Sequence, residues 1–247
     1  MAVNDSVKNL GETIKILKNM GADWNPVHPK LLMPALETLH AEAEAMTEVI
    51  TAAVVFDNLK TKERLTAFAP LNALVRRVYA ASACCEMDKT TVEKVESYKD
   101  LIDGTNIAKA TALRKKKTKK AMALLPEGET LPDAAKTRSI AQLKYEERLA
   151  NFKTLITLLE TAGTYATNEP DLSIAALKTF AVSLVSANEA TEDAYNMLVS
   201  KREERNQLFF GETDSIDFVL EKTKKQLFSK EGKAGVNMKK LTALSSN

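Results

Sequence analysis

The chain contains two similar stretches, residues 29–68 and residues 170–209. Aligning them without gaps gives 11 identical pairs in 40 positions, where about two or three are expected from average composition. The identical pairs include a proline at the start (Pro29 and Pro170) and a phenylalanine at the end (Phe68 and Phe209). A match at a fixed spacing, called the repeat register below, is typical of a duplicated structural unit. The chain is therefore expected to contain two copies of one fold element.

Apolar residues within each copy follow a helical spacing. The chain has only 8 Gly and 7 Pro, and these helix-breaking residues gather at a few positions, which leaves long uninterrupted helical stretches. The stripes step by three and four residues and predict one helix of about 40 residues in each copy, along Leu36, Leu39, Ala43, Met46, Ile50 and Ala53, and along Leu177, Phe180, Leu184, Ala187, Thr191, Ala194 and Leu198. The prediction is an all-α fold, an elongated antiparallel bundle of two repeated three-helix units.

Breaks in the pattern give the domain boundaries. Residues 1–104 form the first unit with one extra helix, for which Thr90 to Glu93 fit a capping box and Gly104 a terminus. Residues 105–133 form a basic linker, and residues 134–229 form the second unit, in which Asp214 is placed to cap the last helix. Residues 230–247 carry two glycines and are expected to form a loosely ordered tail.

Composition excludes several classes of protein. The net charge of +2 gives no overall attraction to nucleic acid or to an anionic membrane. No basic and apolar leader is visible at the first residues, and no stretch approaches 18 apolar residues, so neither export nor a transmembrane segment is expected. Cys84 and Cys85 are adjacent and have no other cysteine to pair with. Two reduced thiols in a cytoplasmic protein are expected.

The densest charge in the chain lies in the linker. Lysine clusters bind phosphate groups, so this stretch is a candidate anion-binding segment for nucleic acid or a membrane surface. It has no aromatic residue for base stacking, which favours a solvated linker as the main interpretation. The candidate residues are Lys109, Arg114, Lys115, Lys116, Lys117, Lys119 and Lys120.

A second charged set recurs in both copies, where apolar residues would continue the stripes. One interpretation is that the ends of the long helices are solvated, with Glu and Arg pairing between the copies. The other is a charged cleft that recognises an acidic partner through planar Arg side chains. The candidate partner-binding residues are Lys60, Glu63, Arg64, Lys201, Glu204 and Arg205.

No catalytic, metal or cofactor site is predicted. Glu37 and His40 have the i, i+3 spacing of a di-iron helix, but the corresponding residues of the second copy are Lys178 and Ala181. Neither of the two histidines lies in a pattern typical of a hydrolase triad. A glycine-rich phosphate loop, a Cys-x-x-Cys pair and a zinc-protease helix are also missing from the sequence.

Three strings of the sequence resemble one protein family. They are FAPLNALVRRVY at 68–79, YEERLANFKTLI at 145–156 and NEPDLSIAALK at 168–178. They are similar to a widespread set of uncharacterised, internally duplicated helical proteins from the Bacteroidota. The resemblance implies a bacterial, helical and duplicated protein. It implies no activity and supplies no functional residues.

These observations favour a non-enzymatic helical scaffold, or protein-interaction protein, whose partner is another protein or a second copy of the chain. The first alternative is an anion binder that uses residues 109–120 for nucleic acid or a membrane surface. The second alternative is a helical pore-forming protein, suggested only by long amphipathic helices. Its best hydrophobic segment, residues 50–56, is too short to cross a bilayer.

Overall fold

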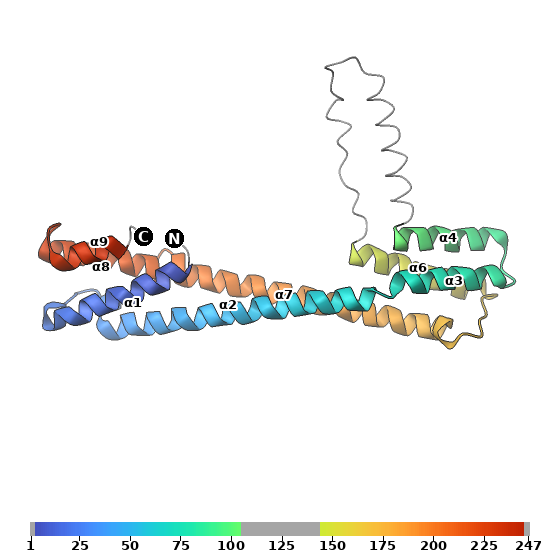
Figure 1. Ribbon diagram of the computed structural model, residues 1–247, viewed down its shortest axis with the longest axis horizontal. Helices are drawn as coiled ribbons and strands as arrows, with labels where there is room; N and C mark the ends of the chain where they lie inside the picture. Colours follow the sequence, from blue (N-terminus) through green and yellow to red (C-terminus); the bar gives the residue numbers. More distant parts are fainter. Residues whose placement is uncertain (1–2, 105–143, 245–247) are drawn as a thin grey trace, which may run out of the picture. The chain divides into compact units, whose positions relative to one another are not determined.

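The computed structural model describes residues 3–104 and 144–244 (Figure 1). Within these two ranges the secondary structure consists of α-helices and short 3₁₀ helices, without a β-strand. The prediction of an all-α fold is therefore confirmed.

Two long helices dominate the described residues. Helix α2 spans Met33–Phe68 and helix α7 spans Ile174–Phe210, with 36 and 37 residues, close to the predicted length. A 3₁₀ turn precedes each, η2 at Pro29–Leu31 and η4 at Pro170–Leu172. Proline suits the first helical position because its missing N–H would have no intrahelical partner there. The two turns begin at aligned positions of the repeat register, and so do the two long helices.

The chain divides into two compact units. Unit 1 consists of residues 1–59 and 193–247, and unit 2 consists of residues 60–192. These units differ from the sequence-based division at residues 104 and 134. Each compact unit combines residues from both of the similar stretches, because α2 and α7 both contribute to each unit.

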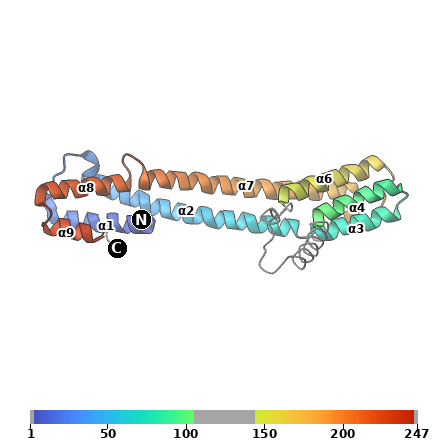
Figure 2. The same ribbon diagram turned by 90° about the horizontal axis from the view of Figure 1, so that it is seen from above.

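Unit 1 packs helix α1 (Val3–Met20) against helices α8 (Ile216–Glu231) and α9 (Val236–Leu244), which also contact each other (Figures 1 and 2). Gly11 lets α1 approach α2 closely, because a Cβ at this position would lie 2.8 Å from His40 Nε2. The short turn η1 (Gly21–Asp23) follows α1. The fully buried core side chains of this unit include Leu10, Leu17, Leu36, Ala43, Phe209, Val219 and Leu227.

The prediction of a loosely ordered tail at 230–247 is wrong for residues 236–244, which form α9. Leu241 of α9 is only 2% exposed and belongs to the unit 1 core. Asn237 stabilises the start of this helix, since its backbone N–H and its side-chain amide both donate to the Glu231 carboxylate. The glycines at 232 and 235 thus form a turn between two docked helices.

Unit 2 contains helices α3 (Leu71–Cys84), α4 (Lys89–Asp103) and α6 (Tyr145–Ala162). Helix α4 lies beside both α3 and α6 (Figure 2). Residues 134–143, the expected start of α6, lie outside the described residues, and Lys144 occupies the N-cap position. The buried core includes Phe68, Leu71, Val75, Val78, Val95, Ile102, Phe152, Leu155, Leu177 and Leu184.

Two helix starts differ from the capping predictions. The N-cap of α4 is Asp88, whose carboxylate accepts the Thr91 N–H at 2.9 Å, so the helix begins before Thr90. The N-cap of α8 is Ser215, while Asp214 has a positive φ of 60° and pairs with Lys30 at 3.2 Å. In each case a neighbouring residue with a short polar side chain has the extended backbone that an N-cap requires.

Each of the two loops before the long helices contains an equivalent hydrogen bond from an aromatic side chain to a backbone carbonyl. In unit 1, Trp24 Nε1 donates to the carbonyl of Leu31 at 2.9 Å. In unit 2, the Tyr165 hydroxyl donates to the carbonyl of Leu172 at 3.1 Å. The two donors are aligned in the repeat register, and so are the two acceptors, although the aromatic residues differ.

Candidate functional site

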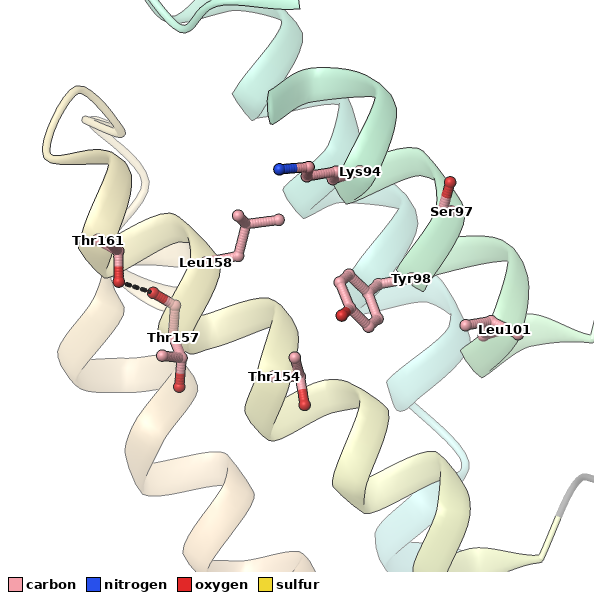
Figure 3. Close-up of a pocket in the computed structure, with 8 residues that line it drawn as sticks. All are labelled: Lys94, Ser97, Tyr98, Leu101, Thr154, Thr157, Leu158 and Thr161. Atoms are coloured by element: carbon pink, nitrogen blue, oxygen red, sulfur yellow. Dashed lines mark hydrogen bonds between the residues drawn. The ribbon is translucent and has the colours of Figure 1, made fainter. Parts of the chain in front are cut away.

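The groove between α4 and α6 in unit 2 is the candidate site. It encloses about 580 Å³ and is open to solvent along one side. Figure 3 shows Tyr98 and Leu158 pointing into the space between the two helices. The lining residues are Lys94, Ser97, Tyr98, Leu101, Thr154, Thr157, Leu158 and Thr161.

The groove is formed by one stripe from each helix. Lys94, Ser97, Tyr98 and Leu101 are spaced i, i+3, i+4 and i+7 on α4, and the four residues from Thr154 to Thr161 have the same spacing on α6. Residues with this spacing share one helix face. The adjacent faces are buried in the unit 2 core, with residues such as Val95 and Leu155. Packing of the inner faces thus fixes the two stripes beside each other.

The hydroxyl groups of the groove are already hydrogen bonded within their own helices. Thr154, Thr157 and Thr161 donate to the carbonyls four residues earlier, at 2.8 to 3.1 Å, and Figure 3 shows the bond from Thr161 to Thr157. Ser97 does the same on α4 at 3.0 Å. Because these hydroxyls are turned to the backbone, the threonines present their methyl groups to the groove.

One charged side chain lines this apolar surface. Lys94 lies at the edge of α4 and is exposed, and no described residue accepts a hydrogen bond from its Nζ. Leu101 contributes an exposed apolar side chain with 42% of its surface accessible. The groove therefore combines apolar surface with a single positive charge and suits a ligand that is mainly apolar and carries a negative group.

The charged residues that recur in both copies form local pairs. Lys60 Nζ lies 2.8 Å from Glu63 in unit 2, and Lys201 Nζ lies 2.8 Å from Glu204 in unit 1. Arg205 donates to the side chain of Asn206. Each of these bonds joins residues of one helix, where neighbouring side chains pair at a lower entropic cost than residues far apart in the sequence.

Arg64 belongs to an aromatic cluster in unit 2. Its guanidinium lies 4.4 Å from the centre of the Tyr145 ring, which packs edge-on against Phe68. Arg148 lies over Phe68, donates to the Ile102 carbonyl and to Asn72, and has its pKa lowered by burial. Cation–π contacts of this kind contribute about 0.5 to 2 kcal/mol. Here Arg64 packs at the end of the hydrophobic core.

The other sequence candidates occupy separate places. Glu37 pairs with Lys18 at 2.7 Å, and His40 Nδ1 lies 3.6 Å from Glu44. Cys85 Sγ donates to backbone carbonyls at 3.1 Å, and its neighbour Cys84 is exposed. In the described ranges, no three His, Cys, Asp or Glu side chains are grouped closely enough to hold a metal ion.

The residues proposed for anion binding cannot be placed, because the structure describes only residues 3–104 and 144–244. They are Lys109, Arg114, Lys115, Lys116, Lys117, Lys119 and Lys120. Among the helices that are described, none has the length and apolarity that crossing a membrane requires.

Comparisons with known proteins gave no relative for this chain. No protein-family model, curated protein or solved structure matched it. The candidate site therefore depends on the geometry of this structure alone.

The α4–α6 groove was not predicted from the sequence. The capping box at Thr90 to Glu93 and the end at Gly104 predicted a helix here, but they did not indicate which side of it borders a groove. Part of the signal was present, since Tyr98, Leu101 and Leu158 widen the apolar faces of the two helices beyond the fully buried residues. An apolar face that is wider than the buried core leaves apolar surface accessible.

Proposed function

We propose that this protein is a non-enzymatic helical scaffold that binds another protein, and that the α4–α6 groove holds an amphipathic helix of the partner. The observation that carries the proposal is the pair of stripes at helical spacing, whose accessible surface is mainly apolar. A partner helix inserts residues at i, i+3, i+4 and i+7 into such a groove. An acidic residue at the edge of the partner helix would pair with Lys94.

The chemistry of the lining favours a protein helix over a small polar ligand. Small-molecule sites combine apolar walls with a few polar groups that converge on the ligand. In this groove Ser97 and the three threonines direct their hydroxyls to their own helices instead. The bound surface is therefore expected to be apolar and extended along the helices.

The proposal retains the architecture expected from the sequence, a bundle of two repeated three-helix units in a cytoplasmic protein of the Bacteroidota group. Support for the duplication comes from elements that recur in the repeat register, namely η2 with η4 and the starts of α2 and α7. The hydrogen bonds of Trp24 and Tyr165 recur in the same register.

The test is affinity capture of the full tagged chain from its own cells, at low and at high salt, with protein and nucleic acid measured separately. Leu101→Asp places a charge in the groove, and Val182→Asp, at a 65% exposed position of α7 in the same unit, is the matched control. We expect a salt-resistant protein partner that is reduced at least about tenfold by Leu101→Asp and retained by Val182→Asp.

Two results would contradict the proposal. One is the absence of any salt-resistant protein partner with the wild-type chain. The other is equal capture of the partner by the Leu101→Asp and Val182→Asp variants. Nucleic acid that is captured at low salt and released at high salt would instead support the alternative of anion binding.

A further inference from the structure

A stripe of exposed apolar residues runs along α2 within unit 1. Its five residues are spaced by four and three in alternation, which is the a and d pattern of a coiled coil. Val49, Phe56 and Leu59 are 41%, 40% and 49% exposed, so much of this surface remains accessible after the core has formed. The stripe consists of Ala45, Val49, Ala52, Phe56 and Leu59.

The buried face of α2 is a different one. Ala43 and Ala53 are buried in the folded chain, and Met46 packs against the unit 1 core. The stripe therefore adds a second apolar face to a helix that already has one. Apolar residues that remain exposed in such a continuous pattern mark an interaction surface more often than isolated ones do.

Helix α7 shows that the fold does not require this stripe. The aligned positions in the repeat register are Ser186, Ala190, Asp193, Met197 and Ser200. Three of these five residues are polar, yet α7 forms a helix of nearly the same length as α2. The apolar character of the stripe is therefore specific to α2 and is not a general property of the long helices.

We propose that this stripe binds the same stripe of a second copy of the chain, with the two α2 helices antiparallel. In antiparallel coiled coils each a position faces a d position of the other helix. With Val49 facing Leu59 of the second copy, Ala52 faces Phe56, so that a small residue lies opposite a large one. A parallel pair would instead place Ala52 against Ala52 and Phe56 against Phe56.

The charges of α2 support the antiparallel register. Glu48 flanks the stripe near its first half, and Lys62 occupies the equivalent flanking position two heptads later on the same continuous helix. In the antiparallel register Glu48 faces Lys62 of the second copy, and symmetry forms the pair twice. In a parallel pair neither residue would meet an opposite charge at these flanking positions.

The α2 stripe is a different surface from the α4–α6 groove, and self-association through it extends the proposed function. Its test needs no partner protein. Sedimentation velocity of the full chain, over about 1 to 200 µM, measures the monomer–dimer equilibrium, since a short interface predicts a dissociation constant in the micromolar range. Phe56→Asp should remove the dimer, and Val182→Asp should not change it. Far-UV circular dichroism confirms that each variant is folded.

Charge reversal tests the orientation. Glu48→Lys alone and Lys62→Glu alone should each weaken the dimer about tenfold, because each replaces two attractive pairs by repulsive ones. The double variant Glu48→Lys/Lys62→Glu should restore the wild-type dissociation constant. A chain that stays monomeric, a dimer that survives Phe56→Asp, or a double variant without recovery would overturn the inference. None of these outcomes depends on Leu101, so failure here is distinct from failure of the groove proposal.

Discussion

Unit 1 and unit 2 have different residues at two corresponding positions of their helices. In unit 1, Gly11 of α1 lies beneath the His40 ring of α2. The aligned positions in the repeat register are Phe152 of α6 and Ala181 of α7, which are both buried in the unit 2 core. The large side chain thus comes from the long helix in unit 1 and from the shorter helix in unit 2. A repeat can therefore keep a filled volume while it exchanges the residues that fill it.

The loops of the two units also have different residues in equivalent roles. Trp24 and Tyr165 both donate to the carbonyl of the residue seven positions later, one through an indole N–H and the other through a hydroxyl. Both acceptors, Leu31 and Leu172, are leucines of the 3₁₀ turns. What recurs is an aromatic donor and its acceptor. An alignment scored by identity gives no weight to the aromatic pair, because the two donors are different residues.

The largest effect is expected from Phe152→Ala. Phe152 is fully buried and packs edge-on against Phe180 with 5.8 Å between ring centres. Its removal should lower the free energy of unfolding by about 3–5 kcal/mol, through lost burial and the remaining cavity. His40→Ala removes the corresponding large residue of unit 1 and should cost less than about 1.5 kcal/mol, since the His40 side chain is 25% exposed. Urea unfolding of both variants measures the difference, and equal losses would contradict the comparison.

The loop donors should have intermediate effects. Trp24→Phe leaves the Leu31 carbonyl without its buried donor and should cost about 1–3 kcal/mol. Tyr165→Phe keeps the ring and removes only the hydroxyl of a half-buried residue, so about 0.5–1.5 kcal/mol is expected. Thermal unfolding of the two variants ranks them. A larger loss for Tyr165→Phe than for Trp24→Phe would show that the two bonds have different roles.

Alkaline pH should affect stability through the Tyr165 loop. Burial, with smaller contributions from Cys85 and Asp171, raises the pKa of Tyr165 from 10.0 to about 12. The Tyr165 hydroxyl therefore holds its proton more tightly in the folded state than in the unfolded state. The contribution of this proton to the free energy of unfolding is complete below pH 10 and is lost as pH rises to about 12. Wild type should therefore lose stability relative to Tyr165→Phe between pH 10 and 12. Urea midpoints of the two proteins across this range measure the effect, and parallel curves would refute it.

Gly11→Ala should have the smallest effect. Alanine favours the helix by about 1 kcal/mol relative to glycine, but its Cβ would meet His40 Nε2, so the partly exposed ring must move outward. The net change should stay within about 1 kcal/mol. In a His40→Ala background the same substitution should be purely stabilising, which chemical denaturation of the four variants tests. A large loss in that background would mean that another contact limits the approach of the helices.

The helices were well predicted from the sequence because their signals are local. The stripes of α2 and α7 and the helix end at Gly104 are as expected. Each of these signals depends on residues within one or two helical turns. The wrong capping predictions involved choices between adjacent residues, such as Ser215 in place of Asp214, where tertiary contacts decide.

The groove and the packing of α9 were not predictable in the same way. Leu241 is buried only because α1 and α8 lie beside it, and α1 lies at the other end of the sequence. The groove likewise requires two helices to place the borders of their buried faces side by side. Helical spacing identifies a face, but it does not identify the neighbour of that face.

The division into compact units also affects how the protein is made. Unit 2 is continuous in sequence, whereas unit 1 combines residues 1–59 with residues 193–247. The unit 1 core contains Leu10 and Leu36 from its first segment and Phe209 and Leu227 from its second. On the ribosome, α1 therefore emerges long before the helices that cover it. Its apolar face cannot be buried against α8 until α8 has been synthesised. Unit 2 has all its residues earlier, so the middle of the chain can fold before the two ends meet.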